Sequence, residues 1–187
     1  MNLEHIKEKV KQVLSEKRYN HSLAVMQRCE ELAQLYGADI EMARKVGIAH
    51  DIAKELKEEE REIAIKQYDI QLDEIEKQNP GLLHAKIGAA MCQNEFGFTQ
   101  EMVQAVENHT TAKPKMDLLS KILFVADATG LDRNWTDLEY ARKLSEINLD
   151  ATIIYIIDLN IRENLEKSKQ IHPNSIYARN ELLGTEK

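Results

Sequence analysis

The sequence has few features of secreted, membrane-bound or nucleic-acid-binding proteins. It contains only two cysteines among 187 residues, Cys29 and Cys92, too few for a disulfide framework and consistent with a reducing compartment. No apolar run of 18 residues occurs, and the N-terminus has no apolar stretch after a basic start, so we expect neither a membrane span nor secretion. The formal charge of -7 disfavours nucleic acid and anionic membranes as partners. These absences predict a cytoplasmic protein.

Helical periodicity runs through the chain, and no strand pattern, repeat or low-complexity segment competes with it. The expected fold is therefore all-α, and the length suits a single compact domain over residues 1–187. We expect an N-terminal helix at about 3–16, a core at about 18–130 and C-terminal helices at about 136–183. Helix boundaries are indicated by Gly37 as a C-cap, by N-caps and by the break at Asn79-Pro80-Gly81; the predicted N-caps are Asp39, Thr99 and Asp117. Gly88 is expected to allow a close helix approach, and Leu165 is expected on the packed face of a long helix from Asp150 to about Ser168.

Several histidines and aspartates fall at inward-facing ends of the expected helices: His21, the pair His50-Asp51, His84, His109 and Asp127. An unpaired buried carboxylate costs several kcal/mol, so an aspartate on an apolar face needs a partner such as a metal ion. Imidazole nitrogen and carboxylate oxygen together suit iron, manganese, zinc or nickel rather than calcium. Spacing alone leaves a metal site and a set of satisfied core or helix-capping residues as equal alternatives.

The order of these residues resembles the H…HD…D pattern of HD-domain metal-dependent phosphohydrolases. The segments that carry it are Arg18 to Val25, Ala49 to Glu55, and Leu123 to Asp127. More narrowly, Leu82-Leu83-His84, Asn108-His109-Thr110-Thr111 and the tail from Ile171 to Asn180 resemble the YqeK family of bacterial HD proteins. The resemblance extends from about Arg18 to Leu183 and implies a single HD-domain helical bundle. It implies a hydrolase that cleaves diadenosine tetraphosphate symmetrically to two ADP.

The resemblance also implies a ligand set. The first metal takes His21, His50, Asp51 and Asp127. His84 and His109 match positions that either bind a second metal, with Asp51 bridging, or face the phosphates. Iron is the implied metal, as one or two ions, and manganese would also fit.

The implied mechanism is attack by metal-activated water, whose pKa a bound metal lowers to about 7. The residues expected at the reaction centre are Asp51, Lys54, His84, His109 and Arg133. The residues expected to bind substrate are Arg18, Lys54, Leu83, His109, Thr110, Arg133, Gln170, Ile171, His172, Pro173, Asn174, Ser175 and Arg179. The expected partners are a dinucleoside polyphosphate substrate and the ADP product. The sequence does not decide between a monomer and a homodimer.

Three other functions share these residues: an HD-type phosphohydrolase of mononucleotides, a non-catalytic nucleotide-binding sensor, and a purely structural helical module. The loop after Asp127 also departs from the family pattern, because Gly130 and Leu131 replace a Glu-Pro pair while Arg133 is kept. This departure leaves the implied metal ligands unchanged.

Overall fold

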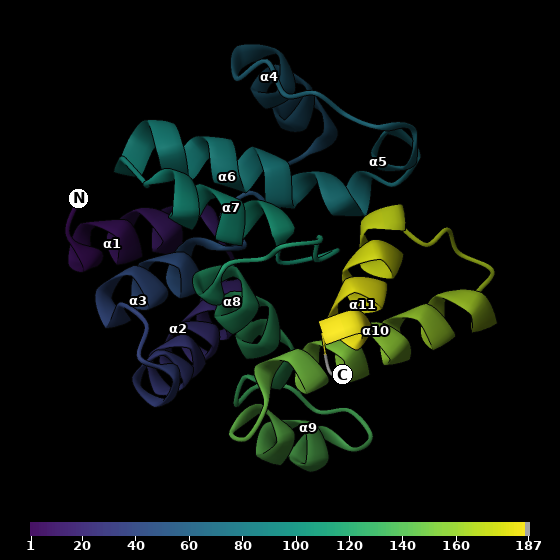
Figure 1. Ribbon diagram of the computed structural model, residues 1–187. Coiled ribbons are helices and arrows are strands. Elements are labelled where there is room, and N and C mark those ends of the chain that lie inside the picture. Colours follow the sequence, from purple (N-terminus) through teal and green to yellow (C-terminus); the bar gives the residue numbers. More distant parts are fainter. Residues whose placement is uncertain (186–187) are drawn as a thin grey trace.

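The computed structural model describes residues 1–185, which form helices and connecting loops (Figure 1). The all-α prediction is confirmed, since no strand occurs among these residues. The helices are α1 (Leu3–Val13), α2 (Glu16–Tyr36), α3 (Ile40–Ala49), α4 (Glu58–Gln67), α5 (Glu74–Gln78), the 3-10 helix η1 (Pro80–Leu82), α6 (Leu83–Phe96), α7 (Gln100–Asn108), α8 (Leu118–Thr129), α9 (Leu138–Ser145), α10 (Leu149–Glu166) and α11 (Pro173–Thr185). None of the described helices combines the length and apolar composition that a bilayer crossing requires.

The predicted helix ends have the expected local geometry. Asp39 accepts a hydrogen bond from the backbone N–H of Met42 at 2.8 Å, and Asp117 accepts one from Ser120 at 2.7 Å. Gly37 ends α2 at φ 72°, a left-handed conformation that glycine adopts without steric cost. Local sequence signals therefore determine where these helices begin and end.

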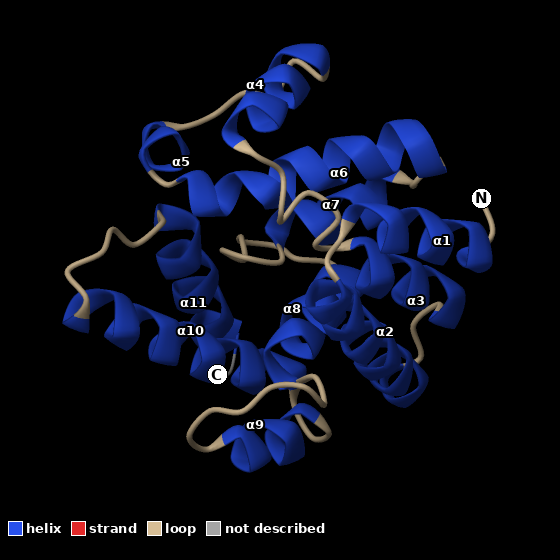
Figure 2. Cartoon of the chain, turned by 180° about the vertical axis from the view of Figure 1, so that it is seen from behind, coloured by secondary structure: helices blue, strands red, loops and turns tan. Residues whose placement is uncertain are grey.

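The core lies where α2, α3, α7 and α8 pack together, and α10 joins it by packing on α8, α9 and α11. Figure 2 shows α10 and α11 side by side, with α4 beyond α6 and α5 close to the start of α11. The most deeply buried large side chains include Leu32, Ile48, Ile122, Leu123 and Ile153. A smaller apolar cluster of Ala53, Ala64, Leu83 and Ile87 lies beneath α4. This packing brings the ends of α2, α3, α6, α7 and α8 to one region.

Two expectations about packing are wrong. A Cβ at Gly88 would lie no nearer than 3.4 Å to any neighbour, which is ordinary contact, so no close helix approach depends on this glycine. The close approach is at Gly47, where a Cβ would lie 2.7 Å from the Cα of Met26. Leu165, predicted on the packed face of α10, is 64% exposed because that end of the helix extends beyond the core.

Candidate metal centre

Six ligand-type side chains from five helices meet in the interior. His21 lies within α2, His50 caps the end of α3 with Asp51 directly after it, and His84 lies in the first turn of α6. His109 caps the end of α7, and Asp127 lies in the last turn of α8. All but Asp127 are buried, with residue exposures of 5% or less. The structure thus brings together every residue predicted as a metal ligand.

Asp51 stands between two groups of imidazoles. Its Oδ2 lies 3.4 Å from Nε2 of His50 and 3.8 Å from Nε2 of His21. Its Oδ1 lies 3.2 Å from Nε2 of His84 and 3.6 Å from Nε2 of His109. Asp127 joins the first group, with Oδ1 3.1 Å from Nε2 of His21. Each oxygen of the Asp51 carboxylate therefore faces a different pair of imidazole nitrogens.

Hydrogen bonds fix the orientation of three of these imidazoles. Nδ1 of His50 lies 2.8 Å from the carbonyl oxygen of Gly47, and Nδ1 of His84 lies 2.7 Å from that of Gly81. His109 makes the same contact with Val106 at 2.6 Å. Because a carbonyl can only accept, each Nδ1 carries the proton in the neutral ring, and the Nε2 lone pair points into the cluster.

Asp132 orients the imidazole of His21 in the same way, a contact that the sequence did not reveal. Its Oδ2 lies 2.7 Å from Nδ1 of His21, on the ring edge opposite the cluster. Carboxylates that accept from a metal-binding histidine orient the ring and raise its basicity. Asp132 lies in a polar loop, where neither helical periodicity nor a capping pattern distinguishes it.

The two central carboxyl groups are held ionised. Burial alone would raise the pKa of Asp51, but the electrostatic interaction with His50 and the neighbouring imidazoles outweighs it and holds this pKa far below its usual range. Burial likewise opposes ionisation of Asp127, and His21, His50 and Arg133 overcome it and lower its pKa. Burial lowers the pKa of His84 to about 4, which keeps this imidazole neutral at pH 7.

The donor set fits a divalent transition metal. Nε2 of His50 and Oδ1 of Asp51 are buried without a hydrogen-bond partner, an arrangement that costs free energy unless a cation satisfies both atoms. Donor atoms of His21, His50 and Asp127 lie within 4.8 Å of one another, and so do those of His50, Asp51 and His109. Neutral imidazole nitrogens and ionised carboxylates are the protonation states that metal binding requires.

Three of the predicted basic residues lie around this cluster. Arg18 donates to Oδ2 of Asp51 at 2.9 Å, and Arg133 donates to both the carboxylate and the backbone carbonyl of Asp127. The ammonium of Lys54 lies 3.2 Å from Nε2 of His84, and burial lowers the pKa of this lysine. Three cationic side chains are therefore anchored on candidate ligands.

Part of the predicted substrate-binding set lines a cavity of about 480 Å³ between η1, the end of α7, α10 and the segment before α11: Thr110, Gln170, Ile171, His172 and Ser175. Within it, Ser175 donates to the carbonyl of Thr111 at 2.7 Å. Nε2 of His172 lies 2.8 Å from Asp73, a contact that holds the tail against the N-terminus of α5.

The remaining predicted residues lie outside this cavity. Pro173 and Asn174 form the first turn of α11 beside it. Leu83 is buried in the smaller apolar cluster beneath α4. Arg179 forms an ion pair with Asp158 of α10 and lines neither this cavity nor the one beside Asp127.

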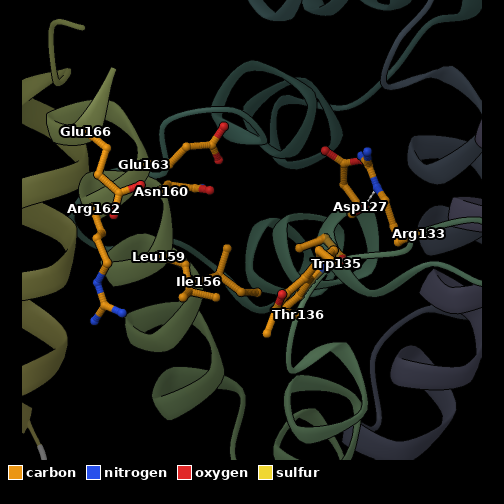
Figure 3. Close-up of a pocket in the computed structure, with 11 residues that line it drawn as sticks. Asp127, Arg133, Trp135, Thr136, Ile156, Leu159, Asn160, Arg162, Glu163 and Glu166 are labelled. Carbon is orange, nitrogen blue, oxygen red and sulfur yellow. Dashed lines mark hydrogen bonds and ion pairs between the residues drawn. The ribbon is translucent and has the colours of Figure 1, made fainter. Parts of the chain in front are cut away.

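A second cavity, of about 500 Å³, opens between α10 and the loop after α8 (Figure 3). Asp127 and Arg133 lie at one end, and Trp135 lies across from Ile156 and Leu159. Asn160 and Glu163 of α10 line both cavities.

The helical fold and the clustered histidines and aspartates define an HD domain, and residues 18–132 match the family model described as "HD domain". A protein of Halalkalibacterium halodurans named "Bis(5'-nucleosyl)-tetraphosphatase, symmetrical" is 37% identical over 93% of this chain and 93% of its own length. A Bacillus subtilis protein of the same name is 34% identical over 98% of both chains. The crystal structure of a Clostridium acetobutylicum protein, described as a "predicted HD superfamily hydrolase involved in NAD metabolism", has 32% identity and a TM-score of 0.94, over 99% of this chain and 98% of that one. The chain belongs to the HD-domain family and, within it, to the YqeK family that contains the two named tetraphosphatases.

Proposed function

We propose that the protein is a metal-dependent hydrolase that cleaves diadenosine tetraphosphate symmetrically and releases two ADP. Membership of the same family as two proteins named for this activity supports the reaction. The observation that carries it is the position of Asp51, whose two oxygens face separate imidazole groups in a buried cluster. A binding module would not require such a set of ionised carboxylates and lone pairs around one point.

The proposed ligands are His21, His50, Asp51 and Asp127, with His84 and His109 completing the second group. A divalent metal held there would supply a water of lowered pKa and would withdraw charge from a phosphoryl oxygen. The protein's own contribution is to orient these donors through fixed Nδ1 hydrogen bonds and to keep the centre buried. We propose iron as the metal; the nitrogen and oxygen donors fit manganese as well.

The three cationic side chains beside the cluster have a separate role. Arg18, Lys54 and Arg133 lie beside the cluster, on a protein whose net charge of -7 otherwise repels polyphosphate. Preorganised positive groups stabilise the charge that develops on phosphoryl oxygens during cleavage. We assign Arg18 and Arg133 to phosphate binding and Lys54 to the phosphate nearest His84.

The test is product analysis with protein purified anaerobically, assayed for metal content and incubated with diadenosine tetraphosphate. We expect iron in the protein and ADP as the sole nucleotide product on ion-exchange chromatography. Formation of AMP and ATP would contradict the symmetrical cut. Faster turnover of a nucleoside monophosphate or triphosphate would instead favour the mononucleotide phosphohydrolase.

Asp51→Asn tests the central carboxylate. We expect a loss of activity of at least about 10²-fold together with loss of bound metal. The matched control is Asp69→Asn, at an exposed carboxylate of the loop after α4, which should leave both unchanged. Tight nucleotide binding without turnover, unaffected by Asp51→Ala, would identify a sensor.

Two further proposals concern the protein in the cell. The two cysteines are free and buried, which supports a cytoplasmic location. We also propose that the protein forms a homodimer in solution, and light scattering during gel filtration would measure its molar mass.

A further inference from the structure

The proposed reaction places two equal nucleoside diphosphates on either side of the cleaved bond, so the site must accept two nucleosides. This inference rests on that proposed function. The two cavities adjoin different halves of the cluster. The first includes Gly81, whose carbonyl holds His84, and Thr110, which follows His109; the second includes Asp127. Their shared residues, Asn160 and Glu163, place both along the same stretch of α10.

We propose that the second cavity binds one nucleoside of the substrate, with its base stacked on Trp135. Several of the tail residues predicted to bind substrate line the first cavity, and the second adjoins the cluster at Asp127, where the other half of the molecule would leave it.

Trp135 is held in a fixed position for this role. Its indole N–H donates to the backbone carbonyl of Ala128 at 2.9 Å, so the polar edge of the ring is satisfied while the side chain lines the cavity. Ile156 and Leu159 form the apolar wall of α10 that faces it (Figure 3). A planar base fits between an indole face and aliphatic side chains, and stacking on an aromatic ring contributes about 1–3 kcal/mol per base.

The charges in the cavity set the direction of the bound nucleotide. Arg133, at the end next to Asp127, attracts phosphate. On α10, by contrast, the carboxylates of Glu163 and Glu166 are offset by Lys167, which pairs with Glu163, and by Arg162, so that wall carries no net positive charge. The same carboxylates and the amide oxygen of Asn160 can accept hydrogen bonds from the exocyclic amine of adenine. The phosphates therefore lie toward the metal cluster and the base toward α10.

Trp135 is the only tryptophan of the chain, so its fluorescence reports on this cavity directly. The first experiment titrates the wild-type protein with a methylene-bridged, non-hydrolysable analogue of diadenosine tetraphosphate. We expect saturable quenching of the tryptophan emission. An unchanged emission at saturating analogue, with saturation established by equilibrium dialysis, would overturn the proposal.

The second experiment compares Michaelis parameters for diadenosine tetraphosphate. Trp135→Ala should raise KM about 5- to 150-fold, with kcat within about threefold of wild type, because stacking holds the substrate but is remote from the cleaved bond. Trp135→Phe keeps an aromatic face and should recover most of the loss. The matched control is Tyr140→Ala, at an exposed aromatic residue of α9 outside the cavity, which should leave KM unchanged.

The outcomes separate this inference from the proposed function. Hydrolysis to ADP with no quenching and an unchanged KM in Trp135→Ala would overturn the nucleoside site and leave the hydrolase proposal standing. Quenching by the analogue without any hydrolysis of the natural dinucleotide would support the site and contradict the proposed reaction. Circular dichroism of Trp135→Ala controls for folding, and wild-type quenching needs no variant.

Discussion

At the scale of single residues, the contact between Asp132 and His21 determines how well the first donor group is oriented. The two atoms lie 2.7 Å apart, and the other ring nitrogen of His21 faces Asp127. Asp132→Ala leaves Nδ1 without this acceptor and frees the ring to rotate. We expect the affinity for Mn²⁺ to fall about 10- to 100-fold, measured by competition with a chelating dye.

Two variants separate orientation of His21 from a general effect on the loop. Asp132→Asn keeps an oxygen acceptor and should retain metal affinity closer to wild type. Asn134→Ala, at an exposed position of the same loop, should have no effect. If Asn134→Ala lowers the affinity as much as Asp132→Ala does, the contact with His21 is not the cause.

The difference between His21 and Asp132 shows what the sequence could reveal about the site. His21 and Asp127 occur where helical periodicity requires apolar residues, so each stands out against its surroundings. Arg18 stands one turn before His21, and its contact with Asp51 joins residues 33 apart, which only the tertiary fold brings together. Sequence therefore predicted which histidines and aspartates meet in the cluster, while Asp132, which orients His21, emerged only from the structure.

At the scale of helices, Gly47 permits the approach of α3 to α2. A Cβ at this position would lie 2.7 Å from the Cα of Met26, and a backbone atom cannot move aside as a flexible side chain can. Gly47→Ala therefore forces the two helices apart near the turn that carries His50. We expect the free energy of unfolding to fall by about 1–3 kcal/mol, measured by urea denaturation.

Gly88→Ala is the matched control within a helix of the same core. Its Cβ would meet Ile52 at 3.4 Å, an ordinary contact, and alanine favours the helix by about 0.5–1 kcal/mol over glycine. We expect unchanged or slightly increased stability. Equal destabilisation by both substitutions would contradict a specific role for Gly47.

Helix positions were predictable to the extent that caps and periodicity determine them. Asp39, Thr99 and Asp117 all cap helices as predicted, because an N-cap is a local interaction. Within the region predicted to hold C-terminal helices, about 136–183, the sequence did not indicate where α9 ends and α10 begins. Whether Gly47 or Gly88 lies at a close helix approach depends on how the helices pack against each other, and the spacing of residues along the chain does not reveal this.

At the scale of the whole molecule, the cluster links helices from residue 21 to residue 127. Five helices contribute side chains to the cluster, and the two ionised carboxylates at its centre, Asp51 and Asp127, carry negative charge that their neighbours and a cation can balance. A metal that binds there stabilises the packing of all five helices at once. Metal binding and global folding should therefore be coupled.

The corresponding prediction concerns thermal unfolding by calorimetry, with Mn²⁺ and with EDTA. At a free metal concentration of about 100 times Kd, binding contributes about 2.7 kcal/mol, which should raise Tm by about 5–10 °C in a chain of this length. If residues 1–187 form one domain, as predicted, each condition should give one transition whose calorimetric and van't Hoff enthalpies agree. Asp51→Ala should abolish the difference between metal and EDTA. Two separate transitions would contradict the single domain, while a full metal-dependent shift in Asp51→Ala would mean that the metal stabilises the fold from another site.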